Sequence, residues 1–195
     1  NVVYTATATS VTDAWLRQTL EAYQCFDLVK SPVTVSFWYK SNRTGTHGVR
    51  LFTSQGTLTD SYQNITVFNA NTWEFKTFVF GTTVGASLAG VTPQNAGWSL
   101  DIGLVVSGQT GITIAVSDYF TLTGVQLEKG TVATPFEVRP YGVELALCQR
   151  YFQISGASMG GGIAYLNYAI SSLVKFPVVM RATPQFTLSS NALRN

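Results

Sequence analysis

The feature that most constrains the fold is a series of short segments in which apolar and small polar residues alternate. In Val33–Lys40, valines alternate with threonine and serine, and aromatic residues follow. In Leu100–Val106, leucine and isoleucine occupy alternate positions. A period of two puts one set of side chains on each face of a strand. Further runs of this kind, separated by Gly, Asn and Ser turns, predict an antiparallel β-sandwich or barrel. These runs span residues 49–53, 65–68, 73–80, 112–116 and 120–127.

Two segments depart from this pattern. Residues 13–22 carry apolar side chains, among them Trp15 and Leu20, with charged residues between them. This arrangement fits a short helix or an irregular strand equally well. Residues 141–152 contain a run of good helix formers with apolar side chains at three- and four-residue spacing. That segment is predicted to form one or two helical turns.

The prolines mark a connector. Proline fixes its own φ and pushes the preceding residue towards an extended conformation. Because Pro135 and Pro140 fall within residues 128–142, we expect this segment to leave the sandwich as an extended chain. Strand-like runs follow a Gly-rich turn at 160–162, namely 163–170, 173–180 and 185–188. The predicted organisation is a sandwich over residues 1–129, a connector with a short helix over 130–152, and a small β-rich C-terminal extension over 153–195.

Composition narrows the functional classes. Only 11% of the residues are charged, 46% are hydrophobic, and the formal net charge is +2. Low charge with frequent aromatics excludes intrinsic disorder, and scattered basic residues argue against nucleic-acid binding. No apolar stretch reaches the ~18 residues of a membrane-spanning helix, so no membrane insertion is expected. The sequence begins at Asn1 without a secretion signal, and we therefore expect a processed or excised piece of a longer chain.

The sequence offers little for metal or disulfide chemistry. Cys25 and Cys148 are too far apart for a Cys-x-x-Cys motif. Two buried free thiols are the favoured interpretation, and a disulfide is the alternative. A β-sandwich can hold calcium through carboxylates and backbone carbonyls. Asp118 and Glu128, near expected strand ends, are the candidate calcium ligands; the alternative is that both are ordinary surface acids and that the chain uses no cofactor.

Catalytic motifs are also missing from the sequence. His47 is the single histidine, and beside two glycines it is expected to be a solvated loop residue rather than a catalytic base. The ten acidic residues are spread singly, without a pair that marks glycoside cleavage. No Walker loop, Gly-x-Gly-x-x-Gly or Gly-x-Ser-x-Gly motif occurs. We therefore predict that the protein is not an enzyme.

Aromatic and polar side chains in the expected loops suit sugar recognition. Sugar rings stack on Trp and Tyr, while their hydroxyl groups bond to polar side chains. Trp38 lies out of phase with the apolar residues of its strand and should face outward, whereas Trp98 should be buried. For every aromatic, a place in the core or an interface is the competing interpretation. The candidate glycan-binding residues, in or beside the expected loops 41–48 and 56–64, are Tyr62, Trp38, Trp73, Asn42, Arg43, His47 and Gln63.

The order of several motifs adds a resemblance. Residues 124–152 read GVQLEKGTVATPFEVRPYGVELALCQRYF, and KFPVVMRATPQFTL occupies residues 175–188. These segments resemble a module of bacteriophage tail fibres and related virion proteins. The segment VTVSFWYK at residues 33–40 resembles part of the jelly roll of carbohydrate-binding modules.

The resemblance implies an all-β, jelly-roll sandwich in a virion component without catalytic activity, usually a homotrimer in a tail fibre or another external appendage. The expected partners are further copies of the chain, other virion proteins and a host cell-surface glycan. A purely structural virion protein, such as a head or neck fibre or a decoration protein, is the alternative, and a glycan depolymerase is less favoured. We would favour the purely structural role if Tyr62, Trp38 and Trp73 were all buried or locked in subunit interfaces.

The C-terminal segment carries apolar side chains that it is too short to bury alone. Burial of one such side chain contributes about 1.5–3 kcal/mol. A threefold axis is one way to bury them, and packing on the sandwich of the same chain is an equal alternative. The candidate oligomer-interface residues are Tyr151, Phe152, Phe176 and Met180.

Overall fold

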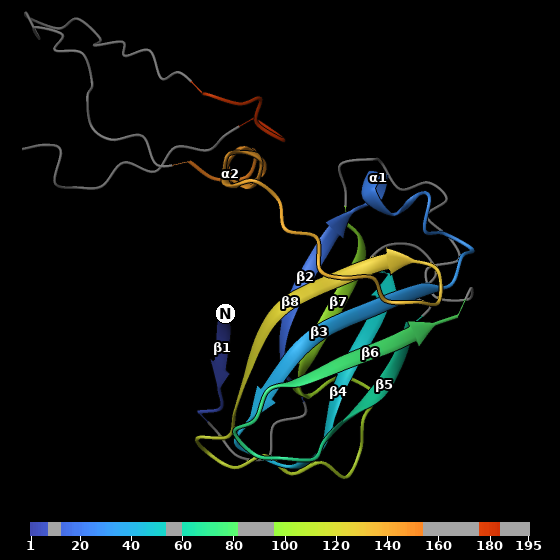
Figure 1. Ribbon diagram of the computed structural model, residues 1–195, viewed down its shortest axis with the longest axis vertical. Helices are drawn as coiled ribbons and strands as arrows, with labels where there is room; N and C mark the ends of the chain where they lie inside the picture. Colours follow the sequence, from blue (N-terminus) through green and yellow to red (C-terminus); the bar gives the residue numbers. More distant parts are fainter. Residues whose placement is uncertain (8–12, 54–59, 82–95, 154–175, 184–195) are drawn as a thin grey trace, which may run out of the picture. The chain divides into compact units, whose positions relative to one another are not determined.

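The computed structural model describes residues 1–7, 13–53, 60–81, 96–153 and 176–183 (Figure 1). The chain forms two compact units, residues 1–137 and 138–195. In the first unit, eight described strands and a one-turn helix follow one another along the chain. They are β1 (Val2–Thr5), β2 (Ala14–Glu21), α1 (Ala22–Cys25), β3 (Val33–Ser41), β4 (Gly45–Thr53), β5 (Asp60–Val67), β6 (Glu74–Phe80), β7 (Ala96–Val105) and β8 (Tyr119–Lys129).

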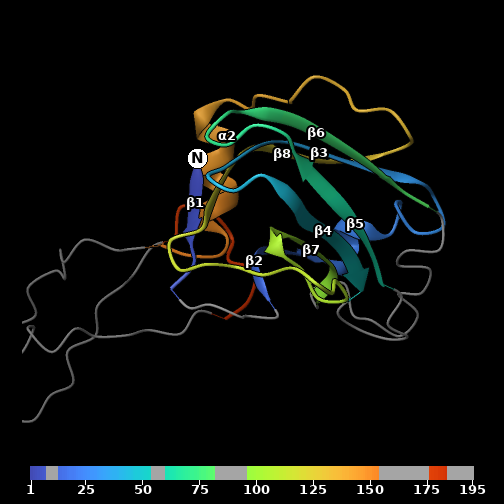
Figure 2. The same cartoon turned by 90° about the horizontal axis from the view of Figure 1, so that it is seen from below.

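The strands form two four-stranded sheets, which Figures 1 and 2 show as two layers. We call the sheet with the order β1-β8-β3-β6 sheet A and the sheet with the order β2-β7-β4-β5 sheet B. Every pairing is antiparallel, and the pairs β1–β8, β2–β7, β3–β6 and β4–β5 are nested one inside the next. This is a long antiparallel ribbon rolled up so that β8 also meets β3 and β7 meets β4. The fold is therefore a jelly-roll sandwich, as the sequence predicts.

Alternation along the strands decides which side chains enter the core. On β3, Val33, Val35, Phe37 and Tyr39 point into the core, and on the opposite face Thr34 and Ser36 are also buried whereas Trp38 is 44% exposed. Trp98 is fully buried, so the sequence-based assignments of both tryptophans are confirmed. Sheet B contributes its own inward-facing set to the same core: Val49, Leu51, Ile65, Val67, Leu100, Ile102 and Leu104.

Side chains close the sandwich where the edge strands of the two sheets meet. Gln63 of β5 donates from Nε2 to the backbone oxygen of Val79 on β6, over 2.8 Å. In the other direction, Lys76 of β6 donates from Nζ to the backbone oxygen of Thr66 on β5. Exposed strand edges present unpaired backbone groups, and these two bonds satisfy some of them within the chain.

Three segments differ from the sequence-based expectation. Residues 13–22, left open between helix and strand, form β2 with two irregularities in its register, followed by the short α1. Residues 112–116, expected to be a strand, form none, although Ile114 is buried in the core. β6, expected to pack on both faces, alternates exposed with half-buried residues because only one of its faces meets the core.

The first part of the connector stays attached to the sandwich. It is hydrogen-bonded to β8: the side chain of Gln126 accepts from the backbone N–H of Glu137 over 2.9 Å and donates to Thr134. Glu128 accepts from both the backbone and the hydroxyl of Thr134. These contacts group residues 130–137 with the sandwich, and the first unit ends at Glu137. The domain boundary placed at residue 129 in the sequence analysis stays a prediction.

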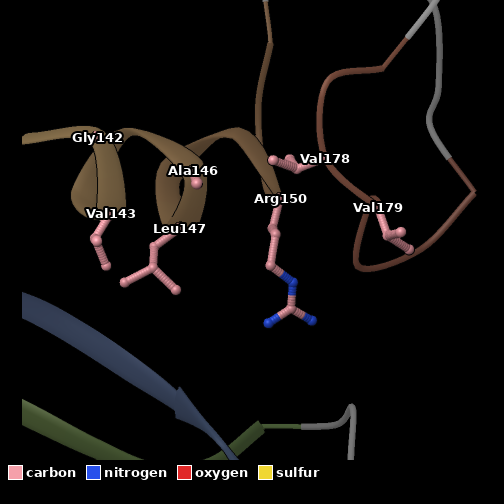
Figure 3. A pocket seen from close by; sticks show the side chains of 7 residues that line it. All are labelled: Gly142, Val143, Ala146, Leu147, Arg150, Val178 and Val179. Atoms are coloured by element: carbon pink, nitrogen blue, oxygen red, sulfur yellow. The ribbon is translucent and has the colours of Figure 1, made fainter.

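In the second unit, the expected helix is present as α2 (Tyr141–Gln149), which starts directly after Pro140. None of its residues is buried. Val143 and Leu147 of α2, with Arg150 just after it, border a groove whose far side is formed by Val178 and Val179 (Figure 3). Residues 176–183 contain no strand, and the other expected strands of the C-terminal extension lie outside the described residues. Neither described helix is long and apolar enough to cross a membrane.

Candidate functional site

The sequence-predicted glycan-binding residues fall in three places rather than one. Trp38 lies on the outer face of sheet A, and Tyr62 lies on the outer face of sheet B. Asn42 and Arg43 form part of the short β3–β4 turn, and His47 follows on β4. No single ligand-binding surface can therefore hold all of the predicted residues.

On sheet A, Trp38 forms part of an apolar surface that we call the aromatic strip, made of Trp38, Phe75 and Phe136. Trp38 packs on Phe75 across the β3–β6 pair with ring centroids 5.4 Å apart. Phe136 of the connector reaches the same place, because Gly124 lies against both the Trp38 and Phe136 rings. The three side chains are 44%, 49% and 54% exposed, respectively. Trp73, half-buried just before β6, has Nζ of Lys40 5.0 Å from its ring centroid.

The predicted residues of the β3–β4 turn serve the fold. Asn42 accepts from the backbone N–H of Tyr119 over 2.8 Å and donates to the backbone oxygen of Ser117 over 3.2 Å. Arg43 donates to three backbone oxygens and lies 3.7 Å from Asp118. Most of the polar groups of both side chains are thus occupied in tying this turn to the β7–β8 loop.

His47 is a correction to the sequence analysis. It is fully buried, and it lies on β4 instead of in a solvated loop. Its Nδ1 is 2.6 Å from the hydroxyl of Tyr39, and its Nε2 is 3.1 Å from the backbone oxygen of Arg43. Burial, reinforced by the positive charge of Arg43, lowers the pKa of His47 to about 3. The residue is therefore a neutral core histidine that cannot contact a surface glycan.

Tyr62 and Gln63 were expected in a loop, and both instead belong to strand β5. Tyr62 is 45% exposed on the outer face of sheet B, with its ring against Gly108 of the β7–β8 loop. Gly108 has φ +94°, and a Cβ there would stand 3.0 Å from the ring. The glycine therefore allows the loop to support the tyrosine. Gln63 has the opposite orientation and is used in the bond to β6 described above.

The most structured polar surface of the described chain is the row of residues that contains Tyr62. Strand pairing places four residues side by side across sheet B, and we call this row the arginine ladder: Arg17 of β2, Asp101 of β7, Arg50 of β4 and Tyr62 of β5. Three strand spacings separate its ends, which is about 14 Å.

Asp101 holds the arginine ladder together. Arg17 binds it with two hydrogen bonds, from Nε to Oδ1 over 2.7 Å and from Nη2 to Oδ2 over 2.9 Å. Nη1 of Arg50 lies 3.8 Å from the other side of the same carboxylate. Asp101 is fully buried beneath these side chains, and the hydrogen bond to it raises the pKa of Arg17 further. Paired and bidentate contacts of this kind fix the arginines in one geometry.

Aromatic rings flank the ladder on both sides. The guanidinium carbon of Arg17 is 3.9 Å from the centroid of Trp15 and 4.9 Å from that of Phe52. Arg50 also lies over Phe52, at 4.2 Å. Arginine stacked between aromatic faces loses little further conformational freedom when a ligand binds. The outer face of sheet B therefore combines rigid N–H donors with an exposed aromatic ring.

The sequence analysis missed Arg17, Arg50 and Asp101. Their meaning depends on strand register, which brings together residues 84 positions apart in the chain. One signal was available: Asp101 stands inside the otherwise apolar alternation of residues 100–106. Its position in the alternation places it on the face away from the core, and only the strand pairing shows that it is buried by Arg17 and Arg50.

The candidate calcium ligands lie at opposite ends of β8. Asp118 accepts from the backbone N–H of Ala115 over 2.9 Å and lies near Arg43, while Glu128 holds the connector. The two carboxylates therefore cannot share an ion. Within the described ranges, no group of three or more His, Cys, Asp or Glu side chains is arranged to hold a metal.

The predicted interface residues lie in the second unit. Tyr151, Phe152 and Phe176 are exposed, and Met180 is half-buried, with its sulfur 3.1 Å from the Nε2 of Gln153. Cys148, on α2, is a free and exposed thiol, whereas burial raises the pKa of the free thiol of Cys25 to about 11. The expectation of two buried thiols is thus wrong for Cys148, because α2 buries none of its residues.

Comparison with known proteins gives a structural similarity only. Neither a known protein family nor a curated protein matches the sequence. A solved structure described as "CBM4 structure and function" is similar to this chain with a TM-score of 0.44 and 15% sequence identity. The match covers 66% of this chain and 70% of the solved chain.

Proposed function

We propose that the chain is a non-catalytic glycan-recognition module of a bacteriophage virion fibre or similar external appendage, with its binding site on the outer face of sheet B. The resemblance of residues 124–152 to virion proteins supports the virion location. The observation that carries glycan binding is the arginine ladder. It offers fixed N–H donors and the half-exposed ring of Tyr62 on one rigid sheet, which are the groups that bind sugar hydroxyls and sugar ring faces.

Two of the predicted aromatics are exposed and so are accessible to a ligand. Tyr62 and Trp38 are 45% and 44% exposed, and Trp73 is half-buried. Burial of all three, or a place for all three in subunit interfaces, would favour the purely structural role. The side chains of Tyr62 and Trp38 are thus available at the surface of the sandwich for contact with a host glycan.

Binding of the chain to a panel of immobilised glycans tests the proposal. Tyr62→Ala and Arg17→Ala change the two ends of the ladder, and each should weaken binding at least about tenfold. Thr66→Ala is the matched control, because Thr66 is exposed on the same strand and face but two rows from the ladder. Failure of every glycan to bind, or equal binding by all variants, contradicts the proposed site.

The aromatic strip favours a second function, assembly within the virion. Three contiguous exposed aromatics on one sheet face are typical of a surface that another protein covers. A homotrimer with Tyr151, Phe152, Phe176 and Met180 at its interface belongs to the same proposal. Light scattering should give three times the mass of the chain, and a variant with Tyr151 and Phe152 changed to serine should be smaller. A monomeric wild-type chain contradicts self-assembly and leaves glycan binding untouched.

A further inference from the structure

On the outer face of sheet B, the carboxylate of Asp101 is occupied by Arg17, whereas part of the Arg17 guanidinium is left for a ligand. Both carboxylate oxygens of Asp101 accept from Arg17. In the neighbouring row of the same face, where Thr19 of β2 pairs with Ser99 of β7, the two hydroxyls are hydrogen-bonded to each other over 3.1 Å. By contrast, Nη1 of Arg17 and the second N–H of its Nη2 donate to no group in the described part of the chain. The guanidinium therefore turns its unused planar end towards solvent, with 36% of the side chain exposed.

Asn64 adds a second outward donor, and Gln109 fixes its orientation. Gln109 comes from the β7–β8 loop and lies flat on Gly48, where a Cβ would come within 2.2 Å of its Oε1. Its Oε1 accepts from the backbone N–H of Val106 over 2.9 Å, and its Nε2 donates to the backbone oxygen of His47 over 2.8 Å. A backbone N–H only donates and a backbone carbonyl only accepts, so these two bonds determine which end of the amide is which.

The orientation of Gln109 then determines that of Asn64. The same Nε2 donates to Oδ1 of Asn64 over 2.8 Å. The oxygen of Asn64 is thereby used inside the protein, and its Nδ2 donor group is the one left for a ligand. Asn64 is exposed and lies in the row next to the ladder, beside Tyr62 on β5.

From the free planar end of Arg17 and the outward amide of Asn64 we infer that the site selects glycans that carry carboxylate groups. This inference rests on the proposed glycan-binding function and specifies its ligand class. A carboxylate only accepts hydrogen bonds, and its two oxygens match the planar end of Arg17. A sugar hydroxyl also needs an acceptor for its own proton, whereas the free end of Arg17 offers donors alone. Asp13 is the opposing group, because its carboxylate lies beside Trp15 and accepts from the indole over 3.3 Å.

The experiment compares each bound glycan with its methyl ester. Esterification removes the negative charge and leaves the rest of the sugar unchanged. The difference between the two affinities, measured by calorimetry, is therefore the contribution of the carboxylate. The acid should bind at least about tenfold more tightly than the ester, and added salt should reduce this ratio. Arg17→Ala should bring the acid-to-ester affinity ratio to about one, and Asp13→Asn should raise it. Thr66→Ala is again the control.

Gln109→Glu tests the positioning role. Glutamate cannot donate to Asn64, whose amide then turns and presents its oxygen to the ligand. The acid-to-ester ratio should fall about tenfold, and Asn64→Asp should lower it in the same direction. A purely structural role of Gln109 predicts equal weakening of acid and ester. Thermal denaturation of each variant shows whether it is folded, and Asn64→Asp, at an exposed side chain, carries the test if Gln109→Glu is not.

The outcomes separate the two proposals. Equal binding of acids and esters, or equally tight binding of sulfated glycans without carboxylates, overturns the carboxylate preference. In that case sensitivity to Tyr62→Ala still supports glycan binding at this face. If no glycan binds at all, the proposed function fails together with the ligand class.

Discussion

The two outer faces of the sandwich follow the same alternating rule and differ in chemistry. Sheet A shows the aromatic strip, and the polar side chains beside it, Gln126 and Glu128, are bonded to the chain's own connector. Sheet B shows charged residues that are linked to one another and leave donors outward. A face already covered in part by its own chain suits protein contacts. A rigid, hydrated face with fixed donors suits a polar ligand, so one small sandwich can serve assembly and recognition at once.

The largest expected effect on stability comes from the carboxylate that distinguishes sheet B. Asp101→Ala removes the common partner of Arg17 and Arg50 from a fully buried position. Leaving charges without their buried partner should lower the free energy of unfolding by about 3 kcal/mol. Urea denaturation measures this, with Thr77→Ala on the exposed face of sheet A as a control within about 0.5 kcal/mol. An Asp101→Ala variant as stable as the wild type would show that the ladder does not organise its face.

The second prediction concerns the core that both faces share. His47 has a pKa of about 3 in the folded chain and an ordinary value of 6.5, so below pH 6.5 protons bind the unfolded chain preferentially. Its contribution to stability is complete above that value and is lost as the pH falls towards 3. Between pH 7 and pH 5 the loss should be about 2 kcal/mol. His47→Gln should remove this dependence, because glutamine does not titrate; an unchanged pH profile would contradict the assignment.

The features of the fold and site that could be predicted from the sequence are those that depend on residues close together in the chain. Alternation in residues 33–40 and 100–106 was enough to predict the sandwich and the positions of Trp38 and Trp98. The helix at 141–149 was predictable because its formers are contiguous. The ladder was not, because Arg17 and Asp101 become neighbours only through strand pairing. His47 was misplaced for a related reason: a histidine beside glycines resembles a turn until the hydroxyl of Tyr39 supplies its buried partner.

A third, smaller effect tests whether the aromatic strip acts as a unit. Trp38 and Phe75 face each other across β3 and β6. Aromatic pairs of this kind contribute about 0.5–1.5 kcal/mol beyond their buried area. A double-mutant cycle with Trp38→Ala and Phe75→Ala should therefore give a coupling free energy of about 0.5–1 kcal/mol. Additive losses would mean that the strip is three separate side chains and that sheet A lacks a distinct surface.

The smallest effect concerns the connector, which makes sheet A different from sheet B. Glu128 accepts from the hydroxyl of Thr134, and this side-chain bond is the main cause of the lowered pKa of Glu128. Glu128→Gln weakens the contact, so limited proteolysis within residues 131–137 should accelerate about twofold. Lys129→Gln, at an exposed neighbour, should leave the rate unchanged. In the wild type the same contact is complete above the ordinary value of 4.5 and is lost as the pH falls through the lowered pKa. Acid should therefore loosen the connector as the substitution does, and equal cleavage rates of the two variants at neutral pH would show that the carboxylate does not hold it.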